Sequence, residues 1–122
     1  MITSLFLKID SIRGGSMEDD HIGWIPIRDY SWPGAVLIGS DPSKISSIDV
    51  RFRAPRDPSF GPLMISATRE TLIGEAKLDW VHGTFGNWVF TLNNCFVRDL
   101  IDKGDWFSFT LTGGKFTGVS VK

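Results

Sequence analysis

Four consecutive polar residues near the N-terminus form the densest group of reactive side chains in this sequence: Glu18, Asp19, Asp20 and His21. Carboxylates beside an imidazole can bind a metal ion or act as a general acid and base, as a hydrolase using Asp20 and His21 would require. Consecutive residues of a turn rarely converge on one ion, however, and the four lack the spacing of a ligand motif. Because so polar a segment is costly to bury, we expect a solvent-exposed loop without catalysis.

The other candidates for chemistry are weaker. His82 precedes a glycine and has no second histidine near it, so we expect a turn residue rather than a base. The Gly-Gly-Lys triplet at 113–115 lacks the rest of a phosphate-binding loop, and the motifs of serine hydrolases and zinc proteases are absent. Arg51, Arg53 and Arg56 could meet an anion, although strand alternation explains two of them as a solvated face. The sequence therefore predicts a non-enzyme with no catalytic residue, no cofactor and no metal.

Cys95 is the single cysteine, so the chain cannot form an internal disulfide and has no cysteine pair to hold zinc. It stands in an apolar, strand-like segment. We expect a small buried side chain rather than a nucleophile.

Composition limits the classes of function. The 122 residues suffice for one domain, 1–122, and 42% hydrophobic with 22% charged residues is typical of a globular chain. Thirteen basic and 14 acidic residues give a net charge of -1, which gives no support for nucleic-acid binding. The N-terminus lacks a signal-peptide pattern, and no apolar run approaches the roughly 20 residues of a membrane span. We expect synthesis in the cytoplasm, no membrane insertion, and no cleavable leader for any export.

Alternating apolar residues predict strands along most of the chain. In 5–10 the residues Leu5, Leu7 and Ile9 share one face. In the strand expected over 21–32, Pro26 cannot donate to a ladder and so indicates an edge or a bulge. A further strand is expected at 45–54, with Ile48, Val50, Phe52 and Ala54 inward. The remaining strands are expected at 75–81, 87–101 and 105–121, the last divided by a hairpin at Gly113-Gly114.

One helix is expected, over about 62–72, with Pro62 in its first turn and Leu63, Met64 and Ala67 at helical spacing. Together the elements predict a mainly β fold, a small barrel or sandwich of about eight strands with one short α-helix.

Residues 6–32, "FLKIDSIRGGSMEDDHIGWIPIRDYSW", resemble the start of the haemolysin-coregulated protein (Hcp) family of type VI secretion. The matching elements are the Phe-Leu-Lys-Ile strand, a Gly-x-Ser turn with charged residues and His21, and the Tyr30-Ser31-Trp32 triplet. Residues 57–80 are similar to the helix and following strand of that family, with Gly61-Pro62 in place of Ser-Pro. The loop at 33–47 is shorter than the extended arm of the family.

The resemblance implies a β-barrel that assembles with itself into hexameric rings. In that family the rings stack into the inner tube of a contractile injection machine related to phage tail tubes. The resemblance also implies a bacterial protein secreted without a signal peptide, with the secretion spike and effector proteins as partners, and effectors carried in the ring lumen.

The resemblance, combined with the alternation of apolar residues along 24–32, identifies candidates for the subunit interface and for the lumen face. Residues 24–32 are apolar on both phases, and a second apolar face needs cover from a neighbouring subunit or from the helix. The candidates for the subunit interface are Trp24, Ile25, Ile27 and Tyr30. Ser31 points away from Tyr30 and Trp32, which makes it the candidate for a lumen-facing contact with cargo. The rival function is a monomeric barrel that binds a small ligand in an apolar pocket.

Overall fold

Seven antiparallel strands form one sheet in the order β2-β1-β5-β6-β7-β4-β3. The structure is a computed structural model and describes residues 4–31, 48–81 and 87–121. Its strands are β1 (Ser4–Ile9), β2 (Ile25–Ile27), β3 (Asp29–Ser31), β4 (Ile48–Pro55), β5 (Ile73–Val81), β6 (Asn87–Asp102) and β7 (Trp106–Val121). The helices are the short 3₁₀ helix η1 (Asp19–His21) and α1 (Phe60–Thr68). The expected mainly β fold with one α-helix is confirmed, and seven strands stand close to the expected eight.

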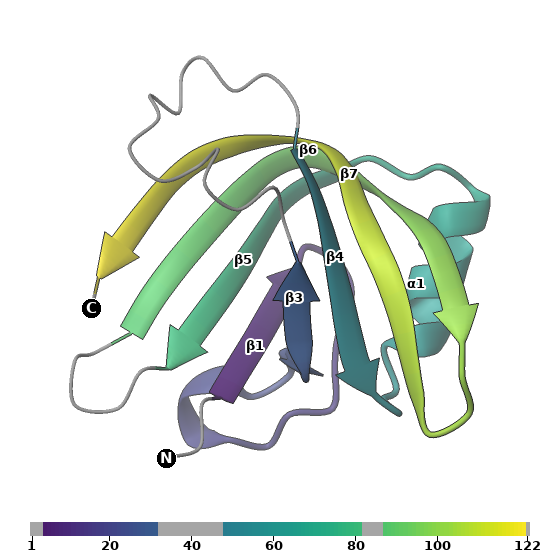
Figure 1. Cartoon of the computed structure of the whole chain (residues 1–122), viewed down its shortest axis with the longest axis horizontal. Helices are drawn as coiled ribbons and strands as arrows, with labels where there is room; N and C mark the ends of the chain where they lie inside the picture. Colours follow the sequence, from purple (N-terminus) through teal and green to yellow (C-terminus); the bar gives the residue numbers. More distant parts are fainter. Residues whose placement is uncertain (1–3, 32–47, 82–86, 122) are drawn as a thin grey trace.

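The sheet curls back on itself. Strands β2 and β3 stand at opposite ends of the sheet order, yet Arg28 alone separates them in the chain. The Arg28 amide donates to the Arg53 carbonyl at 2.7 Å, which joins this corner to β4. Figure 1 shows β6 and β7 arching over the other strands, with α1 beside one end of the sheet. The result is a barrel-like fold whose two sheet edges are joined by the chain itself.

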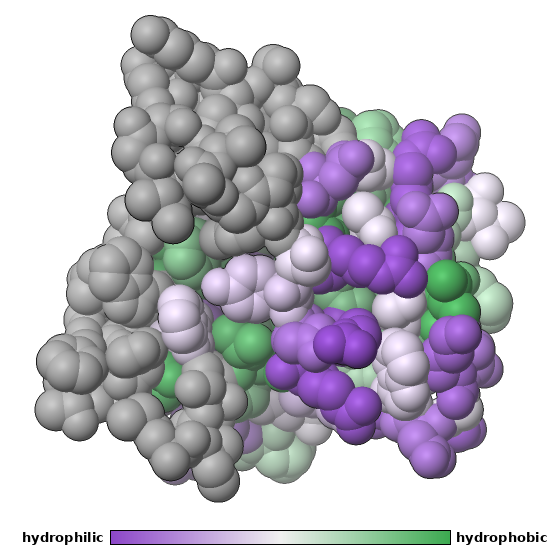
Figure 2. All heavy atoms as spheres, in the orientation of Figure 1, coloured by the Kyte–Doolittle hydropathy of each residue, from purple (hydrophilic) through white to green (hydrophobic). Residues whose placement is uncertain are grey.

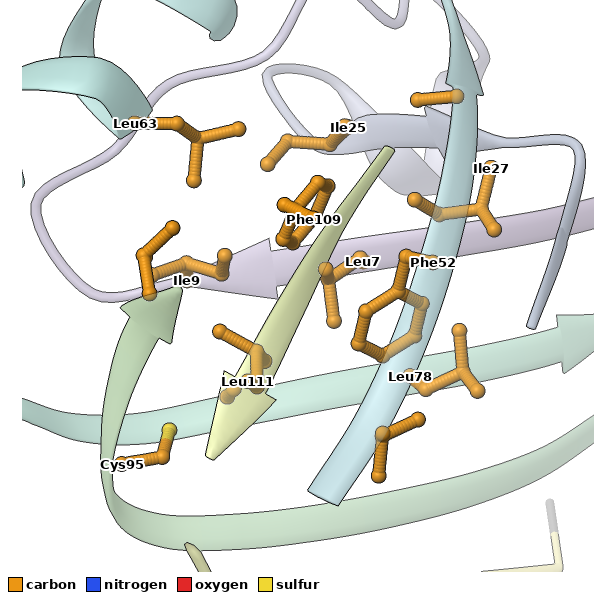
Figure 3. Close-up of a cluster of buried hydrophobic side chains, with 14 of the residues drawn as sticks. Leu7, Ile9, Ile25, Ile27, Phe52, Leu63, Leu78, Cys95, Phe109 and Leu111 are labelled. Carbon is orange, nitrogen blue, oxygen red and sulfur yellow. The ribbon is translucent and has the colours of Figure 1, made fainter. Parts of the chain in front are cut away.

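Buried side chains fill the space inside the curled sheet. Inward-facing residues of β1 and β4 alternate as their sequences predict, with Leu7, Ile9, Val50 and Phe52 all buried. Figure 3 shows Leu7, Ile9 and Phe52 converging with labelled side chains from other strands and from α1. Aromatic rings from β4 and β7 contact one another, with centroids 5.4 Å apart for Phe52–Phe109 and 5.9 Å for Phe107–Phe109. Apolar side chains therefore occupy the described interior.

The long strand expected over 21–32 is wrong in its extent. His21 lies in η1, and the extended part is divided into β2 and β3 where the chain crosses from one edge of the sheet to the other. The edge position inferred from Pro26 is confirmed, because β2 ends the sheet order and pairs with β1. A proline is tolerated there because β2 pairs with a neighbour on one side only, so the missing amide proton of Pro26 can face the unpaired edge.

Two other expectations are corrected by the backbone. Helix α1 begins two residues before the expected start and ends at Thr68, with Leu63 buried and Met64 about half exposed. The hairpin predicted at Gly113-Gly114 is wrong, because β7 continues through both glycines and pairs there with β4 and β6. The real β6–β7 turn contains Gly104, whose φ of +88° suits glycine. Trp32, His82 and the loop at 33–47 lie outside the described residues.

Candidate functional site

The first candidate region is the outer face of β3 and β4, meaning the face that points away from the core. Tyr30 packs against the core, whereas Ser31 is exposed, which agrees with the opposite facing expected from their alternation. Burial raises the pKa of the Tyr30 phenol. In the ladder Ser31 lies opposite Arg51, so the serine is flanked by a cation on the neighbouring strand.

Charged side chains surround Ser31 on this face. Both nitrogens of the Arg53 fork donate to the Asp29 carboxylate, Nε at 2.6 Å, and the Arg53 guanidinium also lies 5.9 Å from the centre of the Trp106 ring. Arg51 donates from Nη2 to the Ser108 hydroxyl at 3.0 Å. Figure 2 shows hydrophilic side chains gathered over the region of β3 and β4. The hollow between them, about 420 Å³, is open and polar, and so suits contact with a macromolecule better than enclosure of a small ligand.

The four interface candidates fall into two groups. Ile25 and Ile27 point into the core and are 0% and 7% exposed, so this chain already covers them. That burial removes the reason for assigning them to a subunit contact, because an apolar surface that is already covered needs no partner. Trp24 and Tyr30 are partly exposed and remain candidates.

The polar cluster at 18–21 differs from its expected form. Glu18, Asp19 and Asp20 are exposed as predicted, but His21 is 2% exposed, so the expectation of four exposed residues is wrong for the histidine. Its imidazole lies between two carboxylates: Nδ1 contacts Oε2 of Glu18, and Nε2 lies 2.7 Å from Oδ2 of Asp79. The imidazole can be buried because both of its nitrogens have hydrogen-bond partners.

Aromatic rings complete the enclosure of His21. The Phe6 ring stacks on the imidazole, with centroids 4.2 Å apart. The Trp24 ring meets the imidazole in a T-shaped, edge-to-face contact, with centroids 4.9 Å apart. Phe6 and Asp79 are directly opposite in the β1–β5 ladder, on the outer face of the sheet. The loop at 14–24 therefore folds back and covers this outer face through His21.

The electrostatics of the cluster favour a charged imidazole. Burial by itself disfavours the imidazolium, but the hydrogen bonds to Asp79 and Glu18 and the attraction of their charges together outweigh it and raise the pKa of His21 above its usual 6.5. The hydrogen bond to His21 in turn lowers the pKa of Glu18. This arrangement is that of a structural ion-pair network, since the imidazole nitrogens are both engaged and buried away from any substrate.

No set of three His, Cys, Asp or Glu side chains within the described ranges is arranged to hold a metal ion. Cys95 is buried in β6, as its segment predicts, and burial raises the pKa of its thiol to about 11. A thiol in that state is a poor nucleophile at neutral pH. Among the described residues we find no group poised for catalysis.

Sequence reasoning missed Asp79 and Phe6. Alternation places Asp79 on the solvated side of its strand, and nothing near it in the sequence indicates a partner 58 positions away. Phe6 did offer a signal, because a phenylalanine on the outer phase of β1 requires cover.

None of the described helices is long and apolar enough to cross a membrane.

Comparison with known proteins shows which solved structures have a similar fold. No protein-family model matches the sequence, and no curated protein sequence matches it. Hcp1 from Salmonella typhimurium matches with a TM-score of 0.67 and 21% identity, covering 99% of this chain and 82% of that chain. Hcp2 from the same organism matches with a TM-score of 0.68 and 18% identity, covering 95% and 83% of the two chains.

A type VI secretion system effector from Yersinia pestis matches with a TM-score of 0.66 and 15% identity, covering 96% of this chain and 82% of that chain. The likeness extends over nearly the whole chain in each case. The Hcp resemblance noted in the sequence is thus confirmed for the fold.

Proposed function

We propose that this chain is a ring-forming tube component of a type VI secretion system. The observation that carries the proposal is the whole-chain likeness to Hcp1, with 99% of this chain aligned at a TM-score of 0.67. A likeness of that extent includes β1 and the loop at 14–24, where the sequence resemblance is also strongest. Two independent kinds of similarity therefore point to one family of tube proteins.

The filled interior supports a structural role over a container for small ligands. A ligand-binding barrel needs an internal cavity, whereas Phe52, Phe107 and Phe109 occupy the described interior of this one. Two buried ionisable groups, His21 and Asp79, bind each other. A subunit built in this way can serve as a rigid wall element, and its filled interior disfavours the monomeric ligand-binding alternative.

Self-association is expected to close into a ring of six, by resemblance to the family. A repeated head-to-tail contact closes when its rotation divides a full turn. Trp24 and Tyr30 are the interface candidates that keep exposed area. Ser31 is the candidate for the lumen face, where the hydroxyl and the neighbouring Arg51 would meet effector cargo.

The remaining parts of the proposal concern the cell. The protein would be made in the bacterial cytoplasm, assembled with further rings and the spike, and exported without a cleavable signal peptide. It would act without enzymatic turnover.

Electron microscopy of the purified protein tests the assembly directly. We expect class averages of rings with six-fold symmetry and an open centre. Rings of another symmetry would contradict the number of subunits, and a field of single small particles would contradict the proposed function. Tyr30→Ala and Trp24→Ala should reduce the fraction of rings, while Met64→Ala on α1 serves as a control.

A further inference from the structure

The loop at 14–24 is tied to the barrel in two different ways. Its base is a short ladder of backbone hydrogen bonds: the Gly14 amide donates to the Gly23 carbonyl at 2.8 Å, and the Ser16 amide to the Trp24 carbonyl at 3.0 Å. The Gly15 amide also donates to Oδ1 of Asp57 at 2.9 Å. Amide donors do not titrate near neutral pH, so these hydrogen bonds keep this end of the loop attached to the barrel across the ordinary pH range.

The tip of the loop, residues 17–22, is held differently. Its one buried side chain is His21, which reaches Asp79 on β5 and Glu18 within the tip. Met17 and Ile22 flank it and are 80% and 55% exposed, so they add little burial. The tip therefore depends on the contacts of one titratable ring.

Protonation decides how many of these contacts can form. A protonated imidazole donates from both nitrogens, one hydrogen bond to each carboxylate. A neutral imidazole keeps one N–H, so its other nitrogen presents a lone pair to a carboxylate oxygen. One of the two hydrogen bonds is then lost and replaced by repulsion.

The described side chains that contact the ring are carboxylates and aromatic rings, with no cation among them. Two cations stand close by, Lys8 and Arg13, which line a hollow together with Ile22, Gly23 and Trp24. Within η1 and the residue before it the charged groups are Glu18, Asp19 and Asp20, all carboxylates. On β5 the group that contacts the ring is Asp79. The next outward residue of β5 is Lys77, whose Nζ lies 3.6 Å from Oε1 of Glu75 and is thus paired with that carboxylate. On β1 the ring stacks on Phe6, with the exposed Lys8 next on that face, and the Trp24 ring closes the remaining side.

We propose that residues 17–22 form a pH-gated clasp, closed on the outer face of β1 and β5 while His21 is protonated and open, with the barrel still folded, when His21 is neutral. Opening uncovers Phe6 and Asp79 and moves Met17 and Ile22. The clasp belongs to a single chain and does not depend on ring formation.

The direction of the pH dependence follows from the raised pKa of His21. The clasp is closed most firmly below the open-state pKa, about 6.5, and this stabilisation is lost as the pH rises through the higher closed-state pKa. Each unit by which closure raises the pKa changes the open-to-closed ratio tenfold. The lowered pKa of Glu18 acts in the opposite sense, because its contribution is lost as the pH falls toward acid.

Amide hydrogen exchange followed by NMR tests the clasp on the wild-type protein. The reporters are the amides of His21 and Trp24, which donate to the Glu18 and His21 carbonyls at 2.9 and 3.0 Å. After correction for the base-catalysed intrinsic rate, we expect their protection to fall as the pH is raised from about 6 to about 9. The protection of core amides such as Phe109 should stay constant over that range.

Two variants assign the effect to His21. His21→Gln cannot titrate, so the reporters should lose their pH dependence; Asp79→Asn removes one carboxylate, so the midpoint should move to lower pH. His82→Gln replaces the other histidine of the chain and serves as the control that keeps the wild-type profile. Constant protection of the His21 and Trp24 amides across the range would overturn the clasp. If the His21 and Trp24 amides lose protection only together with the core amides, the clasp is overturned as well. A pKa of the His21 ring below about 6.5 would also overturn it.

Discussion

Truncation of Phe109 tests whether the barrel interior is closely packed. Phe109 is 0% exposed and its ring contacts Phe52 and Phe107 at centroid distances of 5.4 and 5.9 Å. Replacing a buried phenylalanine by alanine removes apolar burial and leaves a cavity, which together cost about 3–5 kcal/mol. For a domain of this size that loss lowers the melting temperature by about 12–20 °C.

The assay is equilibrium unfolding in urea, with a thermal melt as a second measurement. Met64→Ala is the matched control, because Met64 is about half exposed on α1 and its truncation should change stability by less than about 0.5–1 kcal/mol. A loss below about 1 kcal/mol for Phe109→Ala, equal to that of the control, would refute the reasoning. Such a result would mean that the interior is loosely filled, as in a ligand-binding barrel.

Four further predictions concern single positions. Ser31→Gln should leave the free energy of unfolding within about 0.5 kcal/mol and leave assembly intact, because Ser31 is exposed; urea unfolding and sizing check this, and cargo retention is the property that should change. Gly14→Ala should destabilise the fold by about 1–3 kcal/mol, because its Cβ would lie 2.4 Å from the Trp24 carbonyl oxygen, and urea unfolding measures the loss. Cys95 should resist a thiol reagent at neutral pH until the protein is unfolded, as a buried thiol with a raised pKa does. Trp24→Ala should shift the ring population toward monomer, as seen by sizing, without unfolding the barrel.

The half-buried strands were predictable because their two faces have different surroundings. In β4 the inward Val50, Phe52 and Ala54 are buried while the outward Arg51 and Arg53 are exposed, and the sequence carries that alternation directly. Local sequence also indicated the edge position of Pro26, since a proline disrupts a central ladder.

Features that depend on distant partners were not predictable in this way. Gly113 and Gly114 stand in a typical hairpin sequence, but pairing of β7 with strands on both sides holds the segment extended. The burial of His21 depends on Asp79, 58 residues away, and no local pattern reveals such a pair. The sequence therefore indicated Glu18 and His21 as members of the cluster, missed Asp79, and led to the wrong exposure for His21.

Sedimentation velocity on the purified full chain tests the central claim most directly. One chain has a mass of 13.6 kDa, and the proposed ring predicts a species of about six times that mass. We expect this species to dominate at moderate protein concentration and to persist on dilution, as an assembly closed by repeated identical contacts does. A single species of 13.6 kDa at every concentration, up to the highest attainable, would contradict the account.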